Sequence, residues 1–315
     1  MPCMSDDRKP LHHFWGPRYW PTWLGMAVLR LICALPHRVA LGIGRALGSL
    51  AERLAGSRRA VVRRNIGLCF PDLSATERNA LATRHFQALG MSLIEMGLGR
   101  WASDRWHARV ARLDGLEHLE QALDSGKGVI LLSAHFTTLE ISGRLLAMNC
   151  PPFDAVYRKN RSEFITELQR TGRERSADET IEKRDIKKMV RSLREGRAVW
   201  YAPDQSYDRK GSEVIPFFGV PSMHTTATST LARLGDALVV TFFPQRHDDG
   251  SYEMTMLPAF DNFPSDDPAA DTERYVRALE EHIRKCPEQY FWIHRKFKDL
   301  PESYPDFYAD LDALK

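Results

Sequence analysis

A histidine and a glutamate five positions apart, His135 and Glu140, are the residues of this sequence best suited to chemistry. They stand in the stretch SAHFTTLE (133–140), directly after the apolar run GVILL (128–132). A carboxylate that bonds one imidazole nitrogen fixes the tautomer of the ring and leaves the other nitrogen free to act as a general base. The pair therefore predicts proton transfer. The spacing alone also fits a simpler alternative, a hydrogen-bonded histidine at the end of a strand.

The sequence offers no recognisable nucleophile to accompany this pair. It contains no Gly-x-Ser-x-Gly motif and no phosphate-cradling glycine loop. The five cysteines are scattered without a Cys-x-x-Cys or Cys/His cluster, so we expect neither a metal site nor a disulfide framework, and a reducing compartment fits best. A base without a protein nucleophile suits direct transfer, in which the histidine deprotonates a substrate hydroxyl that attacks an activated acyl group. No cofactor is expected.

From about residue 110, short apolar runs alternate with segments of helical spacing. The predicted strands are 128–135, 153–158, 197–205, 237–245 and 252–260. The predicted helices are 138–148, 164–173, 185–196, 225–235 and 271–286. This alternation predicts an α/β fold with a largely parallel mixed sheet flanked by helices. Catalytic groups of such sheets gather beyond the carboxyl ends of the strands, where His135 lies.

The N-terminal part of the chain is basic, aromatic and apolar. Residues 1–65 hold eleven Lys or Arg and three Asp or Glu, a balance of +8, so the other residues carry −5 of the overall +3. The segment 14–36 has aromatic residues ahead of an aliphatic stretch, interrupted by Arg30. We expect a membrane-associating helical region over 1–65, with segment 14–36 as an in-plane anchor or a marginal span, in front of an α/β domain over 66–315. A core helix of the globular domain is the alternative for segment 14–36.

Two helical stretches follow the anchor. Residues 45–70 have helical apolar spacing with basic residues between, and 74–97 opens with a capping box from Ser74 to Glu77. The arginines are not interleaved with a nucleic-acid-binding motif, so we expect no nucleic acid and favour an anionic membrane as the partner.

Several motifs, in their order along the chain, resemble the late lipid A acyltransferases, the lauroyl/myristoyl transferase branch of the lysophospholipid acyltransferase superfamily. These are GPRYWPTW (16–23), RNIGLCFPDLS (64–74), HFTTLE (135–140), GRERS (172–176), KRDIKKMVRSLREGRAVWYAPDQ (183–205) and CPEQYFWIHRKFKDLPE (286–302). The resemblance covers most of the chain, and the lauroyl-transferring members look most similar.

The resemblance implies roles for individual residues. It makes His135 the general base and Glu140 its orienting partner. It gives Arg173 and Asp204 to substrate binding: Arg173 to hold a substrate phosphate or carboxylate or a developing oxyanion, and Asp204 to position an arginine or a sugar hydroxyl. The sequence departs from the family at APDQSYD (202–208) and in the loop 207–227, whose His224 we expect to be structural. The tail EQYFWIHRKFK (288–298) reads as a core strand with a basic rim, where Arg295 and Lys296 would meet phosphates.

The implied reaction is transfer of a fatty acyl group, lauroyl or similar, from an acyl carrier protein thioester to a hydroxyl of a Kdo-bearing tetra-acylated lipid A precursor. The implied location is the bacterial inner membrane, with the catalytic domain facing the cytoplasm. Two alternatives stay open at this point. One is an acyltransferase for another glycolipid or a lysophospholipid, and the other is a non-enzymatic lipid-binding protein of the same fold.

Overall fold

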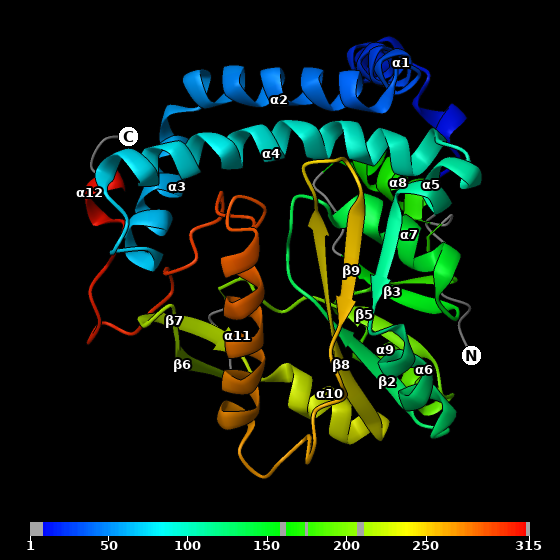
Figure 1. Ribbon diagram of the computed structural model, residues 1–315. Coiled ribbons are helices and arrows are strands. Elements are labelled where there is room, and N and C mark those ends of the chain that lie inside the picture. The colour runs from blue at the N-terminus through cyan, green and yellow to red at the C-terminus, as the bar shows by residue number, and fades with distance from the viewer. Residues whose placement is uncertain (1–8, 158–161, 174–175, 207–210, 313–315) are drawn as a thin grey trace.

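The centre of the protein is a mixed sheet of seven strands, which the computed structural model shows surrounded by helices (Figure 1). The structure describes residues 9–157, 162–173, 176–206 and 211–312, without the side chains of Arg173 and Asp312. The strand order is β1-β9-β8-β2-β5-β3-β4. Among the described residues, β8 pairs antiparallel with β9, and every other neighbouring pair of this sheet is parallel. The strands are β1 (Ala111–Asp114), β2 (Gly128–Leu132), β3 (Phe153–Tyr157), β4 (Glu179–Glu182), β5 (Ala198–Tyr201), β8 (Ala237–Arg246) and β9 (Tyr252–Met256).

Strand β2 lies in the middle of this sheet and is buried on both faces, which explains why all five of its residues are apolar or glycine. Its side chains alternate between two cores. Ile130 and Leu132 belong to one apolar cluster, and Val129 and Leu131 belong to the other. The first cluster includes side chains of α9, α10 and α11, and the second includes side chains of α6 and α7.

Helices cover both faces of the sheet, and a separate antiparallel hairpin lies beside it. The hairpin is β6 (Ser212–Phe217) with β7 (Val220–Thr225). The helices are α1 (Trp20–Cys33), α2 (His37–Leu54), α3 (Gly56–Cys69), α4 (Ala75–Trp101), α5 (Asp104–Val110), α6 (Leu116–Asp124), α7 (Leu139–Asn149), α8 (Glu163–Arg173), α9 (Ile186–Arg194), α10 (Ala227–Gly235), α11 (Pro268–Lys285) and α12 (Ala309–Asp312). Two 3-10 turns, Leu11–Phe14 and Pro17–Tyr19, precede them.

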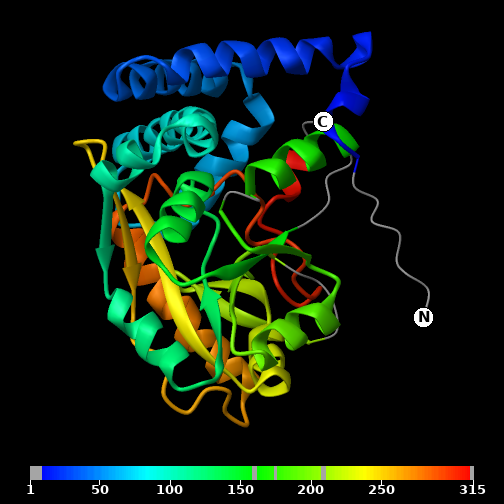
Figure 2. The same ribbon diagram turned by 90° about the vertical axis from the view of Figure 1, so that its right-hand side faces the viewer.

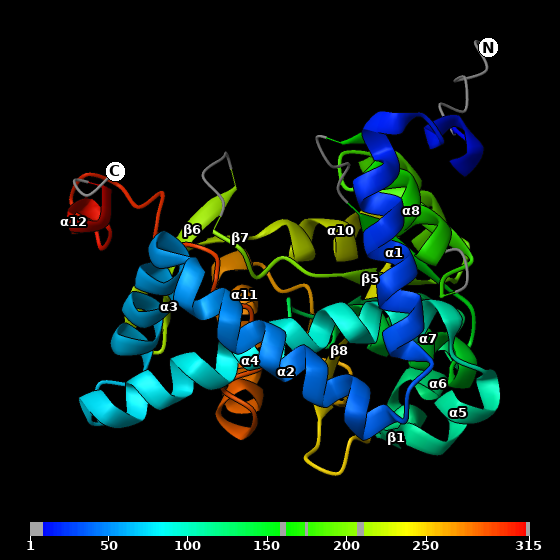
Figure 3. The same ribbon diagram turned by 90° about the horizontal axis from the view of Figure 1, so that it is seen from above.

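The N-terminal helices form an outer layer over α4. Figure 2 shows α1 and α2 above α4, and Figure 3 shows both crossing it. Glycines allow α2 and α4 to approach closely: a Cβ on Gly90 would lie 2.0 Å from the carbonyl oxygen of Gly44, and one on Gly48 would lie 2.1 Å from that of Phe86. Within the ranges that the structure describes, no helix has the length and apolar character needed to cross a membrane.

The comparison with the sequence prediction is favourable for the central elements. All five predicted strands and all five predicted helices of the α/β part are present, with ends shifted by a few residues. The predicted capping box is confirmed, since Ser74 Oγ accepts from the Glu77 amide and Glu77 accepts from the Ser74 amide. The stretch 45–70 is divided at Ala55 into α2 and α3, and the proposed domain boundary at residue 65 falls inside α3.

One element was predicted wrongly. The tail 288–298 is not a core strand but a run of turns, whose β pairing within the described residues is limited to an isolated bridge between Tyr290 and Phe136. Its aromatic residues pack as a cluster instead: the Trp292 ring lies 4.8 Å from that of Tyr290 and 5.9 Å from that of Phe70. Main-chain bonds to the loop after β2 hold the tail beside the end of that strand, so the tail does not extend the sheet.

Candidate active site

His135 lies in the loop between β2 and α7, as the sequence predicted. The amide of Ser133 still bonds the carbonyl of Tyr201, at 2.8 Å, so the loop leaves the sheet beside the carboxyl end of β5. The His135 side chain is 29% exposed, which leaves its ring accessible to a substrate. The hydroxyl of Tyr275 on α11 donates to the Ser133 carbonyl at 2.7 Å and fixes the start of the loop.

Asp204 provides the carboxylate that the structure places on the His135 ring. Its Oδ1 lies 2.6 Å from Nδ1 of His135, and its side chain is almost completely buried. Burial raises the pKa of the Asp204 carboxyl, but the charge and hydrogen bond of His135 and the charge of Lys296 outweigh burial and hold the pKa at about 2. An ionised carboxylate accepts a hydrogen bond from the Nδ1–H group and so favours the tautomer whose lone pair is on Nε2. The geometry therefore suits Nε2 for abstracting a proton.

The two residues meet because β2 and β5 are parallel neighbours. Leu132 pairs with Tyr201, so the segments that follow the two strands emerge at the same edge of the sheet. The sequence separates His135 from Asp204 by 69 positions. The family resemblance implies a substrate-binding role for Asp204, whereas in the structure its carboxylate is buried and bonded to His135.

The tail holds the other side of the His135 loop through its main chain. The Phe291 amide donates to the His135 carbonyl at 3.0 Å, and the Thr137 amide donates to the Gln289 carbonyl at 2.8 Å. The Tyr290 hydroxyl between them donates to Oδ2 of Asp204 at 3.2 Å. Sequence reasoning missed this role because the tail was interpreted as a strand.

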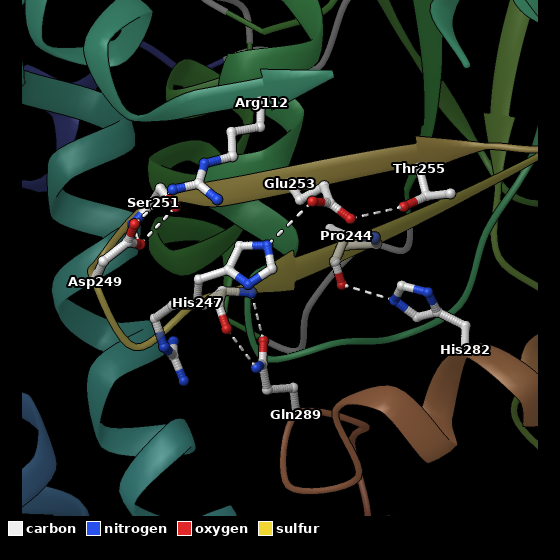
Figure 4. Close-up of polar contacts among 10 residues, drawn as sticks. Arg112, Pro244, His247, Asp249, Ser251, Glu253, Thr255, His282 and Gln289 are labelled. Atoms are coloured by element: carbon white, nitrogen blue, oxygen red, sulfur yellow. Dashed lines mark hydrogen bonds and ion pairs between the residues drawn. The ribbon is translucent and has the colours of Figure 1, made fainter. Parts of the chain in front are cut away.

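Gln289 in turn fixes the tail to the sheet. Its side chain accepts from the Arg246 amide at 2.7 Å and donates to the Arg246 carbonyl at 2.8 Å, at the end of β8 (Figure 4). Nearby, Nε2 of His282 on α11 lies 3.2 Å from the Pro244 carbonyl, which lets α11 contact the same strand (Figure 4). The loop that carries His135 is thus supported by β8 as well as by β2 and β5.

Glu140 lies in the first turn of α7, as the sequence predicted, and is partly buried. Gly99 of α4 packs against it, since a Cβ on Gly99 would lie 3.3 Å from the Glu140 carbonyl oxygen. The hydrogen bond to Nδ1 of His135 that was expected of an orienting acid is made by Asp204. An orienting role for Glu140 stays a prediction.

Glu140 also borders an apolar cleft on one side of the sheet. The cleft lies between the first turn of α7 and strands β3 and β5, and is lined by Leu139, Glu140, Ser142, Gly143, Phe153, Ala155, Val156, Ser176, Ala177 and Trp200. A smaller hollow lies beside Asp204 and is lined by tail residues that include Tyr290, His294 and Lys296.

The remaining predicted site residues are less completely placed. Arg173 is the last residue of α8, and its side chain lies outside the described part of the structure. His224 is buried on β7, as expected of a structural histidine, but its ring nitrogen lies 3.5 Å from the Lys296 ammonium. Lys296 is itself buried, not on a basic rim. Among the described residues, no three His, Cys, Asp or Glu side chains gather in a way that could hold a metal ion.

The comparison with known families agrees with the resemblance found in the motifs. A family model described as bacterial lipid A biosynthesis acyltransferase matches residues 8–299. The chain is 40% identical to the lipid A biosynthesis lauroyltransferase of Escherichia coli (strain K12), over 93% of this chain and 96% of that protein. It is 36% identical to the palmitoleoyltransferase of the same organism, over 97% and 100%, and 29% identical to its myristoyltransferase, over 90% and 89%.

Proposed function

The chain belongs to the bacterial lipid A biosynthesis acyltransferases, and from this premise we propose that it transfers a fatty acyl group from an acyl carrier protein thioester to a hydroxyl of a Kdo-bearing tetra-acylated lipid A precursor. Membership makes it an O-acyltransferase of lipid A biosynthesis. The observation that carries the proposed mechanism is the bond between His135 Nδ1 and the buried Asp204 carboxylate.

In this mechanism, Nε2 of His135 takes the proton of the acceptor hydroxyl as the oxygen attacks the thioester carbonyl. The tetrahedral intermediate then expels the thiolate, which recovers a proton from the imidazolium, and the ester is formed. Asp204 holds the neutral tautomer and stabilises the imidazolium while it exists. No covalent enzyme intermediate is needed, in keeping with a sequence that has no recognisable nucleophile motif.

Glu140 and Arg173 have separate roles in the proposal. Glu140 stands five residues after His135 and beside the apolar cleft, where its carboxylate would help to orient the imidazole or the acceptor hydroxyl. Arg173 would hold a substrate phosphate or the oxyanion of the intermediate, because its guanidinium binds such groups through two parallel hydrogen bonds.

The apolar cleft beside Glu140 is the proposed place of the donor's acyl chain. Its lining is mainly aliphatic and aromatic, with Trp200 and Phe153 on the strands and Gly143 on α7. A cleft of this composition favours a hydrocarbon chain by removing apolar surface from water. Residues that border it would set the accepted chain length, as any change in volume alters the fit.

The outer face of α1 and α2 is the proposed contact with the membrane. It exposes large apolar side chains at helical spacing, namely Trp20, Leu24, Val28 and Leu31 on α1 and Val39, Leu47, Leu50 and Leu54 on α2, with Leu35 exposed in the connection between the helices. Arg30, Arg38, Arg45 and Arg53 are exposed on the same two helices. Apolar side chains with flanking arginines suit a helix pair that lies in the headgroup region of an anionic bilayer. The proposed location is the inner membrane, with the catalytic part facing the cytoplasm.

Mass spectrometry of the reaction product tests this function. The purified protein would be incubated with a tetra-acylated, Kdo-bearing precursor and a panel of acyl carrier protein thioesters. We expect a mass increase of one acyl group, with lauroyl or a chain of similar length preferred. Acylation of a lysophospholipid or another glycolipid in place of this precursor would overturn the proposed acceptor. Lipid binding without transfer by any thioester would indicate a binding protein.

A further inference from the structure

Lys296 is a buried cation in direct contact with the Asp204 main chain. Its ammonium lies 2.6 Å from the Asp204 carbonyl oxygen and 3.5 Å from Nε2 of His224, and it stands 4.8 Å from the centre of the Phe217 ring. Only 4% of the residue is exposed. Because an ammonium has no acceptor, Nε2 of His224 must face it with a lone pair. Such a lysine is not placed to bind a phosphate in solution, so its function must be sought in the interior.

All three oxygens of Asp204 are engaged by different side chains. His135 occupies Oδ1, the Tyr290 hydroxyl donates to Oδ2, and Lys296 donates to the carbonyl. Tyr290 and Lys296 both come from the tail, and together with Asp204 they line the same small hollow. A buried carboxylate is stabilised when its oxygens are hydrogen-bonded and a counter-charge lies nearby.

We propose that Lys296 and Tyr290 are positioning residues that keep Asp204 ionised and oriented against His135 for acyl transfer; this inference rests on the proposed function. The Lys296 ammonium balances the negative charge of Asp204, and the Tyr290 hydroxyl fixes the carboxylate plane. Neither side chain needs to touch a substrate.

In this proposal the charge of Lys296 also acts on His135. A positive charge near the His135–Asp204 pair opposes protonation of the His135 imidazole. Burial lowers the pKa of Lys296 to about 8, against the charges of Asp204, Cys69 and Glu280, which raise it. Burial and Lys296 together lower the pKa of His224 well below its usual value, so that histidine is neutral beside the lysine. Below pH 8 Lys296 is therefore mostly charged.

The test compares Lys296→Met, which keeps the length of the side chain and removes its charge, with Lys285→Met, an exposed lysine at the end of α11. Histidine-labelled full-length protein would be titrated by NMR, with His135→Gln assigning the His135 signal. We expect Lys296→Met to raise the titration midpoint of His135 by about one pH unit. Lys285→Met should leave it unchanged. A purely structural role for Lys296 would alter folding but not this midpoint.

Kinetics provide the second readout. Lys296→Met and Tyr290→Phe should each lower kcat by about ten- to a hundredfold, the range found when the outer partners of a site are removed, with little change in KM. In Lys296→Met the acidic limb of the pH–rate profile should move to higher pH together with the NMR midpoint. Circular dichroism would check folding, and if Lys296→Met does not fold, the kcat of Tyr290→Phe decides.

An unchanged His135 midpoint in folded Lys296→Met, or wild-type kcat in Tyr290→Phe, would overturn the inference. A failure of the proposed function can be distinguished from a failure of this inference. If the wild-type protein does not transfer an acyl group to the precursor, the function is wrong, whereas the NMR midpoint needs no substrate and still decides whether Lys296 acts on His135.

Discussion

The loop that carries His135 and the outer face of α1 and α2 differ in where their partners lie. Around His135, the polar groups find partners within the chain: Asp204 on the ring, and the main chain of the tail on the loop. On the outer face, large apolar side chains such as Leu31 and Leu54, each more than 70% exposed, face away from the fold. The first region is organised by contacts within the protein. The second has a surface that becomes favourable only against an apolar environment outside it.

The contrast teaches where to look for each part of the function. A buried carboxylate on a partly exposed histidine is costly unless the fold provides its partners, so such an arrangement points to chemistry. An exposed apolar face beside arginines costs solubility and indicates a binding surface. Substitutions in the first region should therefore reduce turnover, and substitutions in the second should reduce attachment to the membrane.

His135→Ala should have the largest effect. Loss of a positioned general base typically costs about 10²- to 10⁴-fold in rate, and we expect kcat to fall by that factor. Folding and attachment to vesicles should be unchanged, because the ring is partly exposed and distant in sequence from α1 and α2. Initial rates with a thioester donor and lipid A precursor measure the fall in kcat. Activity above about a third of wild type would exclude His135 as the base.

Asp204→Asn should reduce kcat by about 10²-fold or more. The amide keeps the size of the side chain, but it carries no charge to stabilise the imidazolium and can turn its NH₂ group toward Nδ1, which favours the wrong tautomer. The decisive measurement is kcat at saturating substrates, compared with KM. A rise in KM alone would instead support the substrate-binding role that the sequence suggested for Asp204.

Stability at acidic pH provides an independent test of the same carboxylate. Its pKa is about 2 in the folded protein and near 3.8 without the fold. A depressed pKa contributes stability above pH 4 that is lost as the pH falls from about 4 to 2, by about 2 kcal/mol in all. The free energy of unfolding of Asp204→Asn should therefore approach that of the wild-type protein over this range. If the free energy of unfolding changes with pH in the same way in both proteins, the fold does not stabilise Asp204 in its ionised form.

Much of this arrangement could be predicted from the sequence, for identifiable reasons. The run GVILL predicts a strand covered on both faces, and His135, three residues after it, is therefore expected beyond the end of that strand. The contact with Asp204 could not be read, because it depends on β2 and β5 being neighbours, and strand order is decided by packing across the whole sheet. The strands that were missed are short or polar: β1, β4 and the hairpin β6–β7, in which Pro216 pairs with Pro221.

The tail shows a different limit. Its aromatic residues and alternating polarity are typical of a strand, yet they pack around Trp292 as a cluster, and within the described residues the tail's β pairing is limited to the bridge at Tyr290. Lys296 was expected at the surface because lysines are seldom buried, and only the position of Asp204 explains its place inside.

Glu140→Ala should reduce kcat by about tenfold, less than the loss in Asp204→Asn, because Asp204 already bonds Nδ1 of the histidine. Glu140→Asp should be affected less than Glu140→Ala if the shorter acid still reaches its partner. Rates of the three proteins with the same donor would show this order. Equal rates would mean that Glu140 serves only the start of α7, where a negative charge is favoured by the helix dipole.

The smallest effect is expected from the outer face, where single side chains add modestly to attachment. Leu24→Ser and Leu31→Ser remove apolar groups that are exposed on α1, so neither change should disturb the fold. If each leucine is half-inserted at the headgroup level, its loss costs about 1 kcal/mol and lowers binding to anionic vesicles by about fivefold. Vesicle sedimentation at low and high salt measures this, with Leu234→Ser, exposed on α10, as the matched control.

High salt should release only part of the wild-type protein from the vesicles, since burial of apolar groups does not depend on charge, and detergent should release the rest. Equal binding of all three variants would move the membrane contact away from α1, and complete release by salt alone would leave only the arginines in contact with lipid.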